Sequence, residues 1–260
     1  KMRKIAKEVY NAKLVQYSDT IVVKKYLHNI KSGYKLSKYD IDSRQRKAVE
    51  DRTQADIERC IQQSLNRTKN NVYAFALSNV WEWFYTLTFD PQKVDSFDYT
   101  AVCKALKAWL DDTRKRYAPD MKYIIVPELH KSGRYHFHGM FSNVGAVPLE
   151  YSAAGSTQET AVYNLPSYCY GFTTATMIKD SDRTCSYCLK YITKELCATT
   201  QNKKRYWRSR NLNKPVEYKY NLSDDDFAEQ LDGISDNITF AKTIDIPKAS
   251  NRINLYMTNI

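Results

Sequence analysis

The sequence is poor in the features that mark several large classes of protein. Its 260 residues include seven glycines and seven prolines, too few for a fibrous or low-complexity chain. No stretch reaches the ~20 consecutive apolar residues of a membrane span, so we expect no membrane domain. A GxxxxGKS/T phosphate loop is missing too, which argues against a helicase domain. No signal peptide is visible, although a chain that starts at Lys1 is compatible with removal of an N-terminal segment.

Cysteine and histidine are also scarce, with six and four residues respectively. Cys185 and Cys188 have the spacing of a zinc or redox motif. A structural zinc site needs a second pair, however, and Cys169 and Cys197 stand at no recognised spacing from the first. We therefore expect thiols in a reducing cytoplasm rather than a zinc site or a disulfide framework.

Positive charge and tyrosine, by contrast, are abundant. Lysine and arginine number 40 against 29 aspartates and glutamates, a formal charge of +11, and the chain holds 21 tyrosines. A polyanion such as nucleic acid suits this excess, and tyrosine rings would supply stacking partners for its bases. Many soluble proteins are basic without binding nucleic acid, so composition alone leaves the partner open.

Patterns along the chain predict an α+β fold, with a central antiparallel β-sheet flanked by helices. Strands are expected where β-branched and aromatic residues cluster or alternate, and helices where apolar residues recur at helical spacing. Residues 142–167 are small and polar, and we expect a long loop there. The expected strands are 12–15, 20–26, 81–91, 126–129, 135–141 and 171–178, and the expected helices are 43–79, 98–117, 184–197 and 224–231.

Three segments are expected along the chain. Residues 1–80 would hold N-terminal strands and a basic helix capped by Ser43, residues 81–197 the core, and residues 198–260 an extension that is first basic and then mixed. The basic helix face is interpreted either as solvated or as facing DNA. Its cations are Arg44, Arg46, Lys47, Arg52, Arg59, Arg67 and Lys69.

The chemically richest stretch, residues 121–141, predicts a β-hairpin. His136 and His138 are two residues apart, so on a strand both imidazoles leave by the same face. A three-residue loop at 131–133, with its glycine left-handed, would place Glu128 opposite His136 and on that same face. A two-residue loop would send Glu128 to the other face.

Two imidazoles and one carboxylate can hold a divalent cation and leave positions open for substrate. Glu128, His136 and His138 are therefore candidate metal ligands. A His-x-His pair on its own is more often part of a half-buried strand with polar faces. The nearby acid favours a metal site here, as does the presence of two of the four histidines in one pair.

A second candidate element is the expected helix at 184–197. Tyr187 and Tyr191 are four residues apart, and Lys190 and Lys194 repeat that spacing three residues after each tyrosine. A core stripe of aromatic residues is the alternative interpretation, but such a stripe rarely needs lysines in phase with it. A tyrosine hydroxyl can attack a phosphodiester, and a nearby lysine or helix N-terminus would favour its phenolate form.

Residues 203–210 mix cations with aromatic rings. This composition suits phosphate contacts combined with base stacking, although a solvated run of charge fits it equally well. The candidate DNA-binding residues are Lys203, Lys204, Arg205, Trp207, Arg208 and Arg210.

Together these motifs resemble the replication initiators of the HUH endonuclease superfamily. Residues 85–89 resemble their first motif, His136-Phe137-His138 the second, and the helix with Tyr187 and Tyr191 the third. Tyrosines four apart, each followed by a lysine, are similar to the two-tyrosine initiators of microviruses and bacterial plasmids. The residues after the helix, 205–207 and 213–215, also resemble such proteins.

The resemblance implies Mg²⁺ or Mn²⁺ as cofactor and nicking of one DNA strand at a replication origin. It further implies a 5′-phosphotyrosine intermediate and a free 3′-OH for a host polymerase, with Tyr187 favoured as the first nucleophile. The implied partners are single-stranded or hairpin origin DNA and a host helicase, in the cytoplasm of a bacterial host cell. Two alternatives stay open: a transposase of the same superfamily, and a DNA-binding module of this fold without catalysis.

Overall fold

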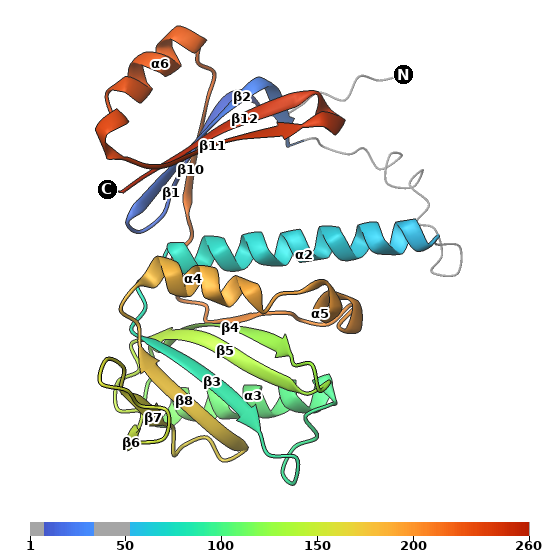
Figure 1. The fold of residues 1–260 in the computed structure, drawn as a ribbon, viewed down its shortest axis with the longest axis vertical. Helices are drawn as coiled ribbons and strands as arrows, with labels where there is room; N and C mark the ends of the chain where they lie inside the picture. The colour runs from blue at the N-terminus through green and yellow to red at the C-terminus, as the bar shows by residue number, and fades with distance from the viewer. Residues whose placement is uncertain (1–7, 34–52, 260) are drawn as a thin grey trace. The chain divides into compact units, whose positions relative to one another are not determined.

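The structure is a computed structural model in which residues 8–33 and 53–259 are described. Contacts divide the chain into two compact units. The larger unit is residues 54–214, and the smaller combines the described part of residues 1–53 with residues 215–259. Figure 1 shows both, and each unit is described by itself.

The larger unit is built on a seven-stranded sheet in which all pairs of neighbours are antiparallel. The strand order is β6-β7-β8-β3-β5-β4-β9, with β3 at the centre (Figure 1). The strands expected at 81–91, 126–129, 135–141 and 171–178 are confirmed. Their bounds, with those of the other strands, are β3 Trp83–Phe89, β4 Lys122–Leu129, β5 Tyr135–Ser142, β6 Glu150–Ser152, β7 Val162–Asn164, β8 Gly171–Met177 and β9 Trp207–Arg208.

One face of this sheet is covered by α3 (Tyr99–Arg116), which confirms the helix expected at 98–117. Asp98 caps the helix, because its carboxylate accepts a hydrogen bond from the backbone N–H of Thr100 at 2.8 Å. The hydrophobic core of the unit lies between α3 and the sheet, as strand alternation requires. Its central side chains are Tyr85, Leu87 and Phe89 of β3, Phe137 and Phe141 of β5, and Val102, Leu106, Trp109 and Leu110 of α3.

The other residues of β3 and β5 point to the opposite face, where α4 (Ser181–Lys190) packs. Two further helices belong to this unit, α2 (Gln54–Leu77) and α5 (Lys194–Thr199). The helix α2 contacts both α4 and α5. Of the helix expected at 43–79, residues 43–52 with Ser43 lie outside the described residues.

The single helix expected at 184–197 is wrong, because the chain breaks it into α4 and α5. The hydroxyl of Thr193 accepts a hydrogen bond from the backbone N–H of Leu196 at 3.2 Å and so caps a new helix. Between the two helices, Ile192 is fully buried. Local side-chain capping and burial of Ile192 therefore outweigh the helical periodicity of the sequence.

The long loop expected at 142–167 contains two short strands, β6 and β7, so that expectation is also wrong in part. Val162 and Tyr163 of β7 pair with β8, and Glu150–Ser152 pair with β7 in turn. These strands extend the sheet at the edge beyond β8. Three-residue strands carry too short an alternation to be recognised in a sequence.

The smaller unit is a five-stranded antiparallel sheet in the order β10-β1-β2-β12-β11, with one α-helix, α6. The expected hairpin at 12–26 and the expected helix at 224–231 are confirmed. The sheet joins strands from both ends of the described chain, so this division differs from the expected segments 1–80, 81–197 and 198–260. The bounds are β1 Glu8–Gln16, β2 Thr20–Ser32, β10 Val216–Tyr220, α6 Asp224–Asp232, β11 Ile238–Ile246 and β12 Asn251–Asn259, with 3-10 helices η2 Ser235–Asn237 and η3 Pro247–Ala249.

The helices in the described ranges were also compared with the length and apolar character that a bilayer requires. Among residues 8–33 and 53–259, none is both long and apolar enough to cross a membrane.

Gly171 gives a test of this sheet, because β8 begins where its backbone passes very close to the end of β3. A Cβ atom at Gly171 would lie 2.1 Å from the carbonyl oxygen of Thr88 and 2.6 Å from the backbone nitrogen of Asp90. Gly171→Ala should lower the free energy of unfolding by roughly 1–3 kcal/mol or more, measured by urea denaturation. The control is Thr174→Ala, at an exposed position of the same strand; its effect should stay below about 1 kcal/mol. Equal stability of the two variants would contradict this packing.

Candidate functional site

The β4–β5 hairpin has the register that the sequence predicts. Glu128 lies opposite His136 across the two strands. The loop closes through a hydrogen bond from the backbone N–H of His130 to the carbonyl of Arg134, at 2.9 Å. Gly133 is left-handed, with φ of 85°. The three-residue loop is thus confirmed, and with it the placement of the acid and both histidines on one face of the sheet.

Glu128 and His138 form a direct pair on this face. Nε2 of His138 lies 2.7 Å from Oε2 of Glu128, and Nδ1 of the same ring lies 3.1 Å from the hydroxyl of Thr86. In a neutral ring with its proton on Nε2, the imidazole donates to Glu128 and accepts from Thr86. The His138 side chain is 7% exposed, against 28% for Glu128. The imidazole is therefore oriented from both sides, and the carboxylate is the partner that solvent reaches.

His136 stands on the same face but makes a different contact. Its ring stacks on that of His130, with centroids 5.5 Å apart and an angle of 7° between the planes. Burial lowers the pKa of His136, against the opposing effect of the Glu128 charge. Both effects place His136 close to Glu128 in a partly desolvated environment, with its neutral form favoured.

The chemistry of this donor set fits a divalent cation. A carboxylate and two neutral imidazoles on one face offer one oxygen and two nitrogen donors, a mixture that Mn²⁺ accepts more readily than Mg²⁺. Within residues 8–33 and 53–259, however, no three His, Cys, Asp or Glu side chains are gathered closely enough to hold a metal ion. The His138 nitrogen that would bind a cation is hydrogen-bonded to Glu128 instead. Binding would therefore require this hydrogen bond to open.

The two candidate tyrosines lie directly against this pair. The ring of Tyr191 stacks on His138 with centroids 3.8 Å apart and an angle of 8°. Tyr187 contacts Tyr191 edge-on at 5.2 Å. Phe84 of β3 contacts both Tyr187, at 5.7 Å, and His138, at 6.0 Å. The structure therefore brings both tyrosines from α4 and its C-terminus to the Glu128–His138 pair.

The two tyrosines differ in their surroundings. Tyr187 is 43% exposed, whereas Tyr191 is half-buried. Burial is the main cause that raises the pKa of Tyr191, and the hydrogen bond with Tyr187 and the charge of Glu128 raise it further. The neutral phenol is thus strongly favoured at Tyr191, while the hydroxyl of Tyr187 stands on the side that solvent can reach.

The two candidate lysines do not repeat along one helix, because Lys194 is the first residue of α5. Lys190 does approach a tyrosine, since its ammonium lies 5.2 Å from the centre of the Tyr187 ring. The expected contribution of a helix N-terminus is wrong, because Tyr187 lies beyond the first turn of α4, where that effect has faded. A catalytic role for Lys194 stays a prediction.

Sequence reasoning assigned no site role to Phe84 or Thr86. Both leave β3 on the face of His138, and Thr86 is its direct partner in the strand register. Their two-residue spacing was visible, but the pairing of β3 with β5 was not. Cys185 and Cys188 are buried thiols on the inner side of α4, where the sulfur of Cys185 lies 4.0 Å from that of Met140 on β5. They anchor α4 on the site face.

The candidate DNA-binding residues at 203–210 separate into two groups. Arg205 is held inside the unit by hydrogen bonds to Ser64, to Thr200 at 2.9 Å and to the carbonyl of Cys197 at 3.0 Å. Trp207 is buried against Phe137, with ring centroids 5.0 Å apart. Structural contacts thus account for these two residues. The other four, Lys203, Lys204, Arg208 and Arg210, line a groove beside α3.

The fold and site define an α+β unit whose antiparallel sheet presents an acid–imidazole pair to two tyrosines. Residues 82–196, from the start of β3 into α5, match the family of replication-associated proteins of the ORF2 type. The match spans less than half of the chain and contains all of the site residues named above on β3, β4, β5 and α4. It supports a rolling-circle, Rep-type family and a role in replication. Searches of curated proteins and of solved structures found no significant match.

The Glu128–His138 pair should leave a signature in the pH dependence of stability. The hydrogen bond from His138 lowers the pKa of Glu128 below its ordinary value of 4.5. A lowered carboxyl pKa contributes stability that is present above about pH 4.5 and lost as the pH falls further. In the presence of EDTA, Glu128→Gln should therefore be less stable than the wild type near neutral pH, with the gap closing on acidification. Urea denaturation over this range measures the gap; one that stayed constant or widened would contradict the pair.

Proposed function

We propose that this protein is a rolling-circle replication initiator that nicks and rejoins one DNA strand at an origin through a covalent tyrosine intermediate. The observation that carries this proposal is the contact of Tyr191 and Tyr187 with the Glu128–His138 pair, including the 3.8 Å stack of Tyr191 on His138. The family match of residues 82–196 gives independent support for a replication role. The DNA would be the single-stranded or hairpin origin of a bacterial replicon.

The proposed chemistry is a transesterification that conserves the energy of the phosphodiester. The tyrosine oxygen attacks phosphorus, the bond from phosphorus to the 3′ oxygen breaks, and a 5′-phosphotyrosine bond forms. The phenolic proton leaves to solvent, and the departing 3′ oxygen takes up a proton to become a free 3′-OH. Attack by a 3′-OH on the phosphotyrosine reverses the step and joins the strand. A host polymerase would extend the 3′-OH between the two events.

Tyr187 is the proposed first nucleophile. Its exposed side chain can reach a phosphate in solvent, and the ammonium of Lys190 beside its ring favours a developing phenolate. Tyr191 is disfavoured for this step, because burial and the nearby Glu128 charge hold its phenol neutral. We assign Tyr191 to the joining step, once the strand has displaced its stack on His138.

Glu128, His136 and His138 would hold a divalent cation, Mn²⁺ or Mg²⁺. When bound there, such an ion polarises the phosphate and offsets charge on its oxygens. Thr86 would fix the orientation of the His138 ring by its hydrogen bond to Nδ1, which leaves Nε2 directed at the site. Phe84 and Tyr191 restrict the motion of the same ring.

The nucleophiles can be tested by trapping the covalent product. With Mn²⁺ and 3′-fluorescein single-stranded oligonucleotides of random sequence, wild-type protein should yield a fluorescent protein band on a denaturing gel. Tyr187→Phe should reduce the first-turnover rate at least ~10²-fold, and the double variant with Tyr191→Phe should give no adduct. Tyr163→Phe, which removes a hydroxyl elsewhere on the larger unit, is the matched control and should react normally.

A persistent adduct in the double variant would refute the assignment of the nucleophiles. If the wild type bound the oligonucleotides but formed no adduct, the protein would be a DNA-binding module without this catalysis.

The histidines can be tested separately from DNA binding. His136→Ala and His138→Ala should abolish adduct formation but change the affinity for an uncleaved single strand by no more than ~3-fold, since lysine and arginine contacts dominate such affinities. EDTA should have the same effect on the wild type, and added Mn²⁺ should reverse it. The control is His28→Ala, in the smaller unit. Adduct formation by His138→Ala, or by the wild type in EDTA, would exclude the metal site.

A further inference from the structure

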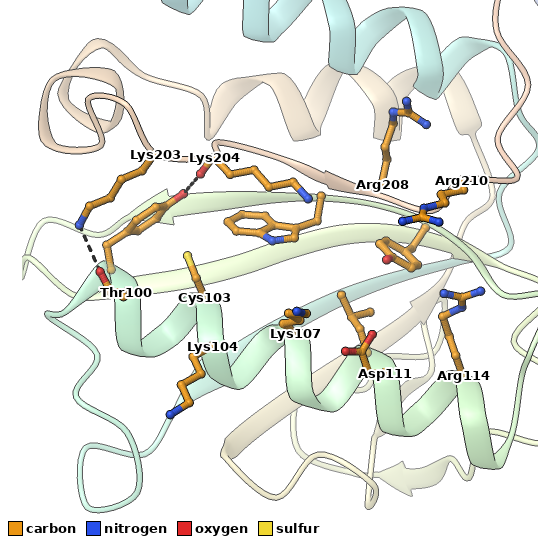
Figure 2. Close-up of a pocket in the computed structure, with 14 residues that line it drawn as sticks. Thr100, Cys103, Lys104, Lys107, Asp111, Arg114, Lys203, Lys204, Arg208 and Arg210 are labelled. Carbon is orange, nitrogen blue, oxygen red and sulfur yellow. Dashed lines mark hydrogen bonds between the residues drawn. The ribbon is translucent and has the colours of Figure 1, made fainter.

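A groove of about 1100 Å³ runs along α3 in the larger unit (Figure 2). It is bounded by α3 and by residues 203–210, which include the edge strand β9. The helix α3 covers the face of the sheet opposite to Glu128 and His138. None of the candidate catalytic or metal-binding residues contributes to the groove, so it is separate from the proposed nicking site.

The lining of this groove is strongly cationic. Two rows of positive side chains contribute to it, one from the helix and one from the facing segment, and among the lining residues Asp111 is the sole carboxylate. Lys104 and Arg114 are ten residues apart, which places them about 15 Å apart along the helix axis. The rows are Lys104, Lys107 and Arg114 on α3, with Lys203, Lys204 and Arg210 on the facing segment.

The aromatic rings of the groove are not available as stacking surfaces. Tyr99 and Trp207 are 3% and 8% exposed, and the hydroxyl of Tyr99 donates to the backbone carbonyl of Lys204. The ammonium groups of Lys203 and Lys204 lie over these two rings, each 5.6 Å from a ring centre. A ligand in the groove therefore meets cations, with the rings beneath them.

The cations also crowd one another. Partial burial lowers the pKa of Lys204, and the charges of Arg208 and Lys107 lower it further. An anion in the groove would relieve both effects, because it would compensate the desolvated ammonium and screen the repulsion among its neighbours.

We propose that this groove binds the sugar–phosphate backbone of duplex DNA. A duplex presents its phosphates outward and keeps the faces of its bases stacked inside, which matches a groove that offers cations without exposed rings. A single strand would leave its bases without a stacking partner here. Binding through phosphates would not depend on base sequence.

This site would add a grip on double-stranded DNA to the strand chemistry of the opposite face. The proposal does not rest on that chemistry, because duplex binding can be measured without cleavage. The background for the test is the full chain with Tyr187→Phe and Tyr191→Phe, so that no covalent product contributes to the signal.

The test compares two charge-matched sets of substitutions by fluorescence anisotropy with a fluorescein-labelled duplex. The groove set is Lys107→Gln, Lys204→Gln and Arg210→Gln. The control set is Lys93→Gln, Lys115→Gln and Arg116→Gln, exposed positions of the same unit outside the groove.

The groove set should weaken duplex binding roughly tenfold or more at low salt. It should also reduce the slope of log affinity against log salt by about three between about 50 and 200 mM salt, because each lost phosphate contact removes close to one. The control set should leave the slope near its original value. The pair Lys107→Arg and Lys204→Arg keeps both charges and should bind as the background protein does.

Circular dichroism of each variant checks folding, and the charge-preserving pair separates loss of charge from loss of structure. Equal weakening by the groove and control sets would show that net charge alone is responsible and would overturn the proposal. Unchanged duplex binding in the groove set would overturn it as well. If the groove set weakened only the binding of a labelled single strand of the same length, the groove would be a single-strand site instead.

Discussion

The proposed site depends on the register of one β-hairpin. Because side chains alternate along a strand, a shift of one residue between β4 and β5 would move Glu128 to the face occupied by the hydrophobic core. The three-residue loop with left-handed Gly133 prevents that shift, and it holds Glu128 opposite His136. The 2.7 Å hydrogen bond between Glu128 and His138 then follows from position alone. The contacts made by Thr86, Phe84 and Tyr191 all converge on this same imidazole.

The sheet of the larger unit separates stability from chemistry by its two faces. On β3, Tyr85 and Leu87 enter the hydrophobic core beneath α3, while Phe84 and Thr86, their immediate neighbours, reach His138. The rigidity of the core therefore passes directly to the proposed site. Two cysteines and Met140 add apolar contacts under α4 on the site face, so that the helix which carries Tyr187 rests on a packed surface rather than on a loop.

Local features of this fold were predictable from the sequence, whereas long-range pairing was not. The strand β3, the helix α3 and the hairpin register follow from alternation, capping by Asp98 and the choice of loop, all of which act over a few residues. The partners of β1 and β2 lie some two hundred residues away in the sequence, in β10 and β12, and no local pattern encodes that pairing.

Within the site, the residue types and their common face were predictable, but their contacts were not. The sequence indicated Glu128, His136, His138 and the two tyrosines, because the spacing of such residues is visible in one dimension. It could not show that Thr193 captures a backbone N–H and ends the helix early, or that Arg205 is committed to Ser64 and Thr200. Both outcomes depend on which partner wins a hydrogen bond in three dimensions.

The break between α4 and α5 gives the two tyrosines unequal mechanical freedom. Tyr187 is embedded in α4, so its backbone can move only with that helix. Tyr191 is the C-cap residue, followed by a two-residue link before α5 begins at Lys194. A rotation of backbone angles in this link would swing the Tyr191 ring away from His138 while Tyr187 kept its place. One phenol would then stay fixed to a loaded strand while the other approached a second strand, so that both ends could be held on a single chain.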